Sequence, residues 1–259
     1  MKNELKVALI QSDLAWENPE QNRQNFSAKI ASITKPVDLV ILPEMFTSGF
    51  TMNPNEVAET MTGETISWMK KISEEKNAAI TGSLIIKEKN NYFNRLIFVH
   101  PNGNIDTYDK RHTFTLAGEH KVFTAGKSNI LVNYKGWKIK PLVCYDLRFP
   151  VWSRNVEDYD LVFYVANWPK VRTHAWDVLL QARAIENMSY CIGINRVGLD
   201  ANNHEYSGHS AAYDVLGKRK DTIPEDKEAI DIVTLDKKHI ETYRNKLGFL
   251  NDRDDFNLK

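Results

Sequence analysis

Three polar residues of the chain stand at the ends of apolar segments, and their types are those of covalent acyl chemistry. Cys144 ends the apolar run 137–144, Glu44 follows the run 38–42, and Lys110 follows a segment with the pattern of a hairpin strand. A thiol nucleophile needs a base that takes its proton and a positive group that stabilises the tetrahedral oxyanion. The carboxylate and the amine supply these two roles, so the set indicates acyl transfer through a thioester.

Each of these residues, taken alone, also has an ordinary structural explanation. A lone cysteine most often packs as a small hydrophobe, and an acid after Pro43 is typical of a solvated loop that begins where a strand ends. The segment 109–112 (DKRH) is typical of a charged turn. The second cysteine, Cys191, lies in an alternating apolar segment, and we assign it to core packing. The chemical interpretation therefore depends on the combination of the three residues.

Other chemistries find less support in the sequence. The chain has seven histidines, but none stands in a strand-end context comparable to that of Cys144, which disfavours a Cys–His dyad. No H-E-x-x-H, C-x-x-C, P-loop or G-x-G-x-x-G motif is present, so zinc, dithiol and nucleotide sites are not indicated. A thiol redox sensor would explain a reactive Cys144 but leaves Glu44 and Lys110 without a role. A non-catalytic interaction protein leaves the whole set unexplained.

Composition limits the classes of partner. The 259 residues include 34 basic and 34 acidic side chains, so the formal net charge is zero. A neutral chain lacks the field that draws proteins to nucleic-acid phosphates or anionic lipid, so we expect neither nucleic acid nor a membrane as partner. The apolar runs are far shorter than the roughly 20 residues of a membrane span, and no signal-peptide core precedes the first strand. Two cysteines cannot form a disulfide framework, so we expect a cytoplasmic protein.

Short apolar, β-branched runs predict the strands that must position these residues. The predicted strands are 5–11, 38–42, 78–86, 92–100, 130–134, 137–144, 161–166, 190–196 and 229–235. Lys135-Gly136 and the segment 101–103 are predicted turns, because glycine adopts positive φ without steric cost.

Helical patterns lie between the strands. Asn18-Pro19 opens one helix, 65–77 forms another, Thr173 is the predicted N-cap of a third, and Asp236 that of the last. No repeat or Pro/Gly/Ser linker divides the chain, so we predict a single domain, 1–259, with a core of about 5–235 and a C-terminal helix and tail, 236–259. Strands that alternate with helices and hairpins predict sheets covered by helices, a layered α/β sandwich.

The motifs resemble those of the nitrilase, or carbon–nitrogen hydrolase, superfamily. The resemblance covers roughly 5–235, and its motifs are VALIQ at 7–11, LPEMF at 42–46, YDKRH at 108–112 and CYDLRFP at 144–150. The segments YVANWP at 164–169 and ARAIEN at 182–187 are similar to the ω-amidase branch of that superfamily.

This resemblance implies a four-layer α-β-β-α sandwich with the active site at one end of its two sheets. It implies Glu44 as general base, Lys110 as oxyanion stabiliser and Cys144 as nucleophile. Glu119 matches the place of a second glutamate that orients the lysine and the substrate amide. The resemblance further implies that the enzyme uses no metal or organic cofactor and that two chains pair into an eight-layer homodimer.

The ω-amidase branch implies hydrolysis of the terminal amide of short dicarboxylate monoamides such as 2-oxoglutaramate and 2-oxosuccinamate. The backbone N–H of Tyr145 would be the second oxyanion donor. Arg148 is the candidate for the distal carboxylate of the substrate, or it forms a structural ion pair with Asp146 or another acid. Phe114 and Trp168 are candidates for apolar pocket walls, or they belong to the core. A nitrilase, an acyltransferase or an amidase with another small substrate remains the alternative within the superfamily.

Overall fold

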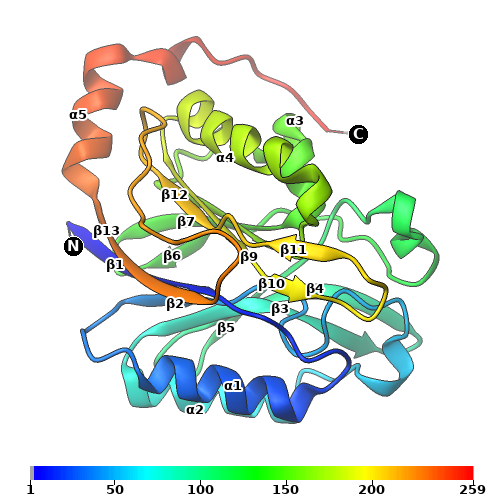
Figure 1. The fold of residues 1–259 in the computed structure, drawn as a ribbon. Coiled ribbons are helices and arrows are strands. Elements are labelled where there is room, and N and C mark those ends of the chain that lie inside the picture. The colour runs from blue at the N-terminus through cyan, green and yellow to red at the C-terminus, as the bar shows by residue number, and fades with distance from the viewer. Residues whose placement is uncertain (1–2, 259) are drawn as a thin grey trace.

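Two facing sheets form the centre of residues 3–258, the part of the chain that the computed structural model describes, with one small hairpin beside them (Figure 1). The six-stranded sheet has the order β13-β1-β2-β3-β4-β5, and the five-stranded sheet has the order β12-β9-β8-β7-β6. The strands of the first sheet are β13 (Ala229–Asp236), β1 (Glu4–Gln11), β2 (Leu39–Ile41), β3 (Ala79–Glu88), β4 (Asn91–Val99) and β5 (Ile105–Asp109). Those of the second are β12 (Ala211–Tyr213), β9 (Tyr190–Asn195), β8 (Leu161–Ala166), β7 (Trp137–Val143) and β6 (Val132–Tyr134). The hairpin pairs β10 (Val197–Leu199) with β11 (Glu205–Ser207).

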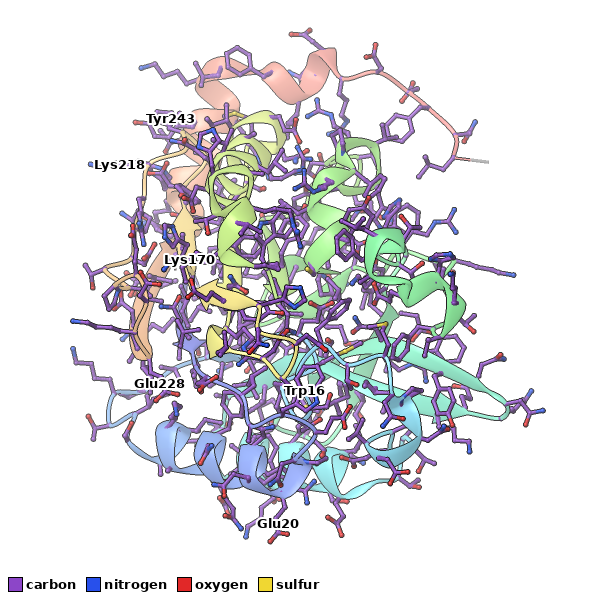
Figure 2. The ribbon with its side chains drawn as sticks, turned by 45° about the vertical axis from the view of Figure 1, so that its right-hand side comes forward. Trp16, Glu20, Lys170, Lys218, Glu228 and Tyr243 are labelled. Carbon is purple, nitrogen blue, oxygen red and sulfur yellow. The ribbon has the colours of Figure 1, made fainter. Side chains whose placement is uncertain are left out.

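Helices cover the outer faces of both sheets and complete the α-β-β-α sandwich that the sequence predicts (Figure 1). Helices α1 (Pro19–Ala31) and α2 (Glu64–Lys76) lie below the first sheet, and α4 (Thr173–Asn187) lies above the second together with the short α3 (Pro150–Ser153). Helix α5 (Lys237–Leu247) follows β13 at one side. Figure 2 shows Glu20 of α1 and Tyr243 of α5 on opposite outer surfaces. None of the helices in the described part of the chain has the length and apolarity to cross a membrane.

Side-chain alternation along the strands divides the core into layers. In β1, Leu5 and Val7 belong to the cluster between the two sheets, whereas Ala8 and Ile10 belong to the cluster that contains Phe26 of α1. Successive residues of a strand point to opposite faces, and both faces of these sheets are covered. The sequences of these strands are therefore nearly continuous runs of apolar residues.

Local signals in the sequence place several boundaries correctly. The side chain of Asn18 accepts the N–H of Gln21 at the start of α1, and Asp236 caps α5 in the same way. Lys135 and Gly136 both have positive φ, 50° and 86°, in the turn between β6 and β7. These caps and this turn confirm the predicted starts of the first and last helices and the predicted hairpin.

The helix that covers the second sheet begins one residue earlier than the prediction. Thr173 is the first residue of α4 and not its N-cap, because its hydroxyl donates to the carbonyl of Lys170 (2.9 Å) and does not accept a helix N–H. The predicted strand ranges do not include β5, which was indicated only as a hairpin-like segment before Lys110, nor the short strands β10, β11 and β12. Strand β13 pairs antiparallel with β1, which returns the end of the chain to the first sheet.

Candidate active site

Three strands end at one side of the sandwich, and each leads into one of the candidate catalytic residues. Glu44 lies three residues after β2, Lys110 directly follows β5, and Cys144 directly follows β7. Ligand crevices of α/β sheets form outside the carboxyl ends of the strands, where loops can converge. All three residues are buried, with exposed fractions of 0%, 1% and 8%. The structure therefore places side chains that are distant in sequence at one common location.

A buried ionic cluster fixes the amine between two carboxylates. The Nζ of Lys110 donates to Oε1 of Glu44 (2.8 Å) and to both carboxylate oxygens of Glu119 (2.9 and 3.1 Å). Asn94 bridges the two acids through its Nδ2, at 2.8 Å from Glu44 and 3.2 Å from Glu119. Burial alone would lower the pKa of Lys110, but Glu119 and Glu44 raise it well above its ordinary value. The amine therefore stays charged, as an oxyanion donor must.

Glu119, the second carboxylate of this cluster, also binds the backbone at Phe114. Burial raises the pKa of Glu119, although the ammonium of Lys110 opposes that shift. One oxygen of Glu119 also accepts the backbone N–H of Phe114. Glu119 thus contacts both the amine of Lys110 and the backbone of Phe114, a predicted pocket residue.

Cys144 begins a 3₁₀ turn, Cys144–Arg148, with a backbone φ of 42°. Met45, which directly follows Glu44, also has a φ of 42°. A left-handed conformation is strained for residues other than glycine, and such strain concentrates at functional sites. The strained backbone thus lies at Cys144 itself and at the residue directly after Glu44.

The thiol of Cys144 is neutral in this environment. Burial and the neighbouring Glu44 carboxylate raise its pKa well above the ordinary value, and Lys110 only partly opposes them. A neutral thiol is a weak nucleophile, so attack requires a base that removes its proton as the bond forms. Glu44, whose carboxylate acts on the pKa of this thiol, is the neighbouring group that could serve as that base.

The two oxygens of Glu44 have different surroundings. Oε1 accepts hydrogen bonds from Lys110 and Asn94, both at 2.8 Å, which uses both of its lone pairs. Oε2 accepts the backbone N–H of Asn167 (2.8 Å) and makes only a long 3.5 Å contact with the Nδ2 of that residue. A lone pair of Oε2 therefore remains available for a proton.

The buried side chain of Asp146 connects the turn that begins at Cys144 to the segment after Lys110. Asp146 accepts the backbone N–H of Val143 (3.1 Å), the hydroxyl of Tyr108 (2.8 Å) and the backbone N–H of His112 (3.0 Å). The predicted alternative for Arg148, an ion pair with Asp146, does not form. Within residues 3–258 no acid lies within salt-bridge distance of that arginine.

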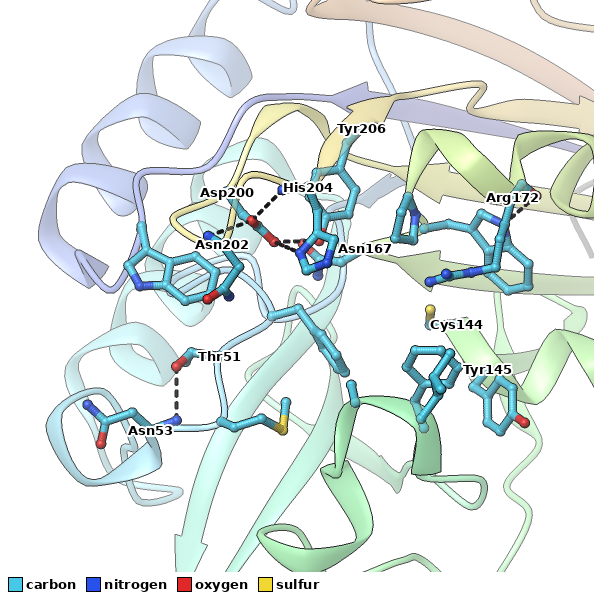
Figure 3. A pocket seen from close by; sticks show the side chains of 18 of the residues that line it. Thr51, Asn53, Cys144, Tyr145, Asn167, Arg172, Asp200, Asn202, His204 and Tyr206 are labelled. Carbon is cyan, nitrogen blue, oxygen red and sulfur yellow. Dashed lines mark hydrogen bonds and ion pairs between the residues drawn. The ribbon is translucent and has the colours of Figure 1, made fainter.

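A cavity of about 620 Å³ opens over Cys144 and includes the predicted pocket residues (Figure 3). Its lining comes mainly from loops and 3₁₀ turns, with Tyr206 from β11. The lining residues predicted from sequence are Phe114, Cys144, Tyr145, Arg148 and Trp168. Figure 3 shows a polar lobe on the far side of the cavity, where Asp200 accepts hydrogen bonds from its own loop and from Tyr206. Trp16, labelled in Figure 2, also lines the cavity.

Two arginines face the cavity, each stacked on an aromatic ring. The guanidinium of Arg148 lies 4.8 Å from the ring centre of Trp168, and that of Arg172 lies 5.2 Å from Phe114. No ion pair of either arginine occurs among the described residues. Trp168 also contacts Trp176 at 5.4 Å between ring centres, so it is both a core residue and a cavity wall.

Sequence reasoning missed three residues of the site. Asn167 directly follows β8, and the strand-end argument that identified Cys144 applies equally to it. Arg172 lies in the 3₁₀ turn Lys170–Arg172, where no motif marks it. Asn94 lies inside β4, and its sequence context contains no signal of its contacts with the two glutamates. Among the described residues, no group of three or more His, Cys, Asp or Glu side chains is arranged to hold a metal ion.

The chain is similar to known proteins along nearly its whole length. The family model named "Carbon-nitrogen hydrolase" matches residues 6–245. "Omega-amidase YafV" from Yersinia enterocolitica is 44% identical over 254 residues, 98% of each chain. "2-oxoglutaramate amidase" from Bacillus subtilis is 31% identical, over 82% of this chain and 83% of that protein. The crystal structure of a CN-hydrolase superfamily protein from Xanthomonas campestris, with an arsenic adduct in its active site, is 40% identical, has a TM-score of 0.97 and covers 100% of both chains.

Proposed function

The chain belongs to the carbon–nitrogen hydrolase family, in its ω-amidase branch, and we propose that it hydrolyses the terminal amide of short dicarboxylate monoamides such as 2-oxoglutaramate and 2-oxosuccinamate. The observation that carries the proposal is the buried cluster in which Lys110 lies between Glu44 and Glu119 beside the neutral thiol of Cys144. This cluster contains a nucleophile, a base and a charged hydrogen-bond donor, and the names of two relatives supply the substrate class.

In the first half of the reaction, the sulfur of Cys144 attacks the amide carbon while Oε2 of Glu44 takes the thiol proton. The oxyanion forms beside the Nζ of Lys110 and the backbone N–H of Tyr145. That N–H lies in the first turn of the 3₁₀ segment, where backbone donors have no acceptor within the segment. Glu44 then gives its proton to the amide nitrogen, the C–N bond breaks, and ammonia departs. The acyl group stays on the sulfur of Cys144 as a thioester.

In the second half, water attacks the thioester carbon. Glu44 takes a proton from that water, and the same two donors hold the second oxyanion. The C–S bond breaks, the proton returns to the sulfur of Cys144, and the dicarboxylate leaves. Glu44 therefore works first as base and then as acid in each half, which requires that one of its oxygens stay free.

The two stacked arginines are suited to the distal carboxylate of the substrate. Arg148 and Arg172 line the same cavity as Cys144, and aromatic faces hold both guanidinium groups in place. A guanidinium fork can bind a carboxylate through two parallel hydrogen bonds. We assign the carboxylate to these two side chains, with Phe114 and Trp168 as their supports.

The activity is tested by ammonia release from a panel of short ω-amides. We expect turnover of 2-oxoglutaramate by the wild type, none by Cys144→Ala, and nearly unchanged turnover by Cys191→Ala, because Cys191 is a buried residue of β9 outside the cavity. Ordinary ammonia release by Cys144→Ala would exclude the thioester route. Release from a nitrile or dependence on an added amine, with no hydrolysis of the amides, would favour the nitrilase or acyltransferase alternative.

The carboxylate assignment is tested with succinamate and butyramide, which share a chain length and differ in the distal carboxylate. Arg172→Gln and Arg148→Gln should lower kcat/KM for succinamate about 10- to 100-fold, the range for a charge-assisted hydrogen bond, and should change butyramide little. Lys170→Gln is the matched control, since Lys170 lies beside Arg172 but is not part of the cavity lining. An unchanged preference in both arginine variants would reject the assignment.

We also propose a homodimer that buries the outer face of α4. Val178 and Ile185 lie seven residues apart on this helix and are 49% and 48% exposed. Large apolar side chains on one exposed face are typical of an interaction surface. Light scattering should report twice the mass of the chain, and Val178→Glu with Ile185→Glu should report a single chain.

A further inference from the structure

Asn167 places an unpaired hydrogen-bond acceptor beside the base. This residue is 4% exposed and, like Cys144, belongs to the cavity lining, and Figure 3 labels it among the side chains of that cavity. Its Nδ2 donates to the backbone carbonyl of Glu44 (2.6 Å) and approaches the Glu44 carboxylate. Both of those oxygens can only accept, so the nitrogen must face Glu44 and Oδ1 must face away from it.

The Oδ1 of Asn167 has no hydrogen-bond partner among the described residues. Buried polar atoms are nearly always paired, because an unpaired one loses its hydration without replacement. A ligand that brings an N–H group to this wall would remove that penalty. The Oδ1 of Asn94 is also unpaired, but Asn94 is not part of the cavity lining.

We propose that Oδ1 of Asn167 accepts a hydrogen bond from the N–H of the scissile amide and thereby selects amides over esters. This inference rests on the amidase function proposed above and assigns a specificity role to a residue outside the predicted set. The backbone N–H of Asn167 already holds Oε2 of Glu44, so one residue positions both the base and the leaving group.

The hydrogen bond matters at the step in which the C–N bond breaks. After the sulfur adds to the carbonyl carbon, the nitrogen becomes tetrahedral and gains a lone pair that must point at the proton on Glu44. An acceptor that holds one of the two N–H bonds fixes the rotation about the C–N bond and directs that lone pair. Proton transfer from Glu44 then releases ammonia and leaves the acyl group on sulfur. An ester leaves as an alcohol and has no N–H for Asn167 to hold.

The test compares a monoamide with the methyl ester of the same dicarboxylate, succinamate with monomethyl succinate, by kcat/KM. In Asn167→Leu we expect the amide-to-ester ratio to fall about 10- to 100-fold from its wild-type value, the range for a lost hydrogen bond to a buried group. The ratio is independent of how much of the variant is folded. Asn167→Ala is the second variant, and we expect its ratio to fall as well.

Asn94→Leu is the matched control, because it removes a side-chain donor to Glu44 and Glu119 at a residue that does not line the cavity. We expect it to lower both rates while the amide-to-ester ratio stays within about twofold of wild type. Equal losses of amide and ester turnover in Asn167→Leu would overturn the inference and leave Asn167 as a positioning residue for Glu44. Failure of the wild type to hydrolyse the amide would instead refute the proposed function itself.

Discussion

Replacing Lys110 by methionine tests whether the buried ionic cluster serves the reaction. The side chain keeps a similar length but removes the cation that contacts Glu44 and Glu119 at 2.8 and 2.9 Å. Loss of one preorganised oxyanion donor costs about 2.7–4 kcal/mol, so kcat/KM should fall about 100- to 1000-fold. Removal of one partner from a buried ion pair also destabilises a fold by about 3–5 kcal/mol. For a chain of this size that corresponds to a drop of about 6–20 °C in Tm.

The stability loss of this variant should depend on pH in a defined direction. Burial already raises the pKa of Glu119, and Lys110 is the group that opposes the shift, so in Lys110→Met this pKa rises further. A carboxyl whose folded pKa lies above its unfolded value of about 4.3 destabilises the fold progressively as pH rises through the folded pKa. Thermal melting of the variant and the wild type should therefore differ more at pH 8 than at pH 5.

Lys140→Met is the matched control for this experiment. Lys140 is likewise 1% exposed and pairs with Glu157 at 2.9 Å, but the side chain of Glu157 is 35% exposed and stays in contact with water. We expect this variant to lose stability without the same dependence on pH and to keep its activity. Activity of Lys110→Met within tenfold of wild type, or a pH-independent stability loss like that of Lys140→Met, would refute the reasoning.

Two further predictions concern the backbone that holds Lys110 and the protonation state of the Cys144 thiol. Gly126→Ala should lower both stability and kcat/KM, because an added Cβ would lie 2.0 Å from the carbonyl oxygen of Asp109 and would displace the backbone before Lys110. Thermal melting measures the first effect and ammonia release the second. Wild-type values in both assays would contradict this prediction. The alkylation rate of Cys144 by iodoacetamide, measured in Cys191→Ala, should still rise with pH above 9, since burial and Glu44 raise the pKa of the thiol. A plateau near pH 7 would indicate a preformed thiolate.

The sequence predicts the strand ends better than it predicts the side chains that meet there. Apolar runs that stop at Cys144 and before Glu44 are local patterns, so they indicate both the strands and the candidate catalytic groups. The α-β-β-α sandwich and the family are confirmed by the comparisons and by the layers of the structure. Glu119 follows no strand, and only the resemblance to a family pointed to it.

Other features depend on contacts between distant segments. Asn94 lies in the middle of β4, and its pairing with two glutamates follows from the loops that fold over that strand. The return of β13 to the edge of β1 joins residues more than 200 positions apart, and no periodicity encodes such a partner. Arg172 faces the cavity because it lies directly before the first residue of α4. The residues around Arg172 in the sequence do not specify this orientation.

The most direct test of the central claim, a covalent acyl intermediate on Cys144, is the partition of products in the presence of hydroxylamine. Succinamate and monomethyl succinate carry the same acyl group, so both must form the same thioester if the sulfur attacks first. At a fixed hydroxylamine concentration, the ratio of hydroxamate to free acid should then be identical for the two substrates, and Cys144→Ala should form neither product. A ratio that changes with the leaving group would contradict a shared thioester and would favour direct attack by water or amine.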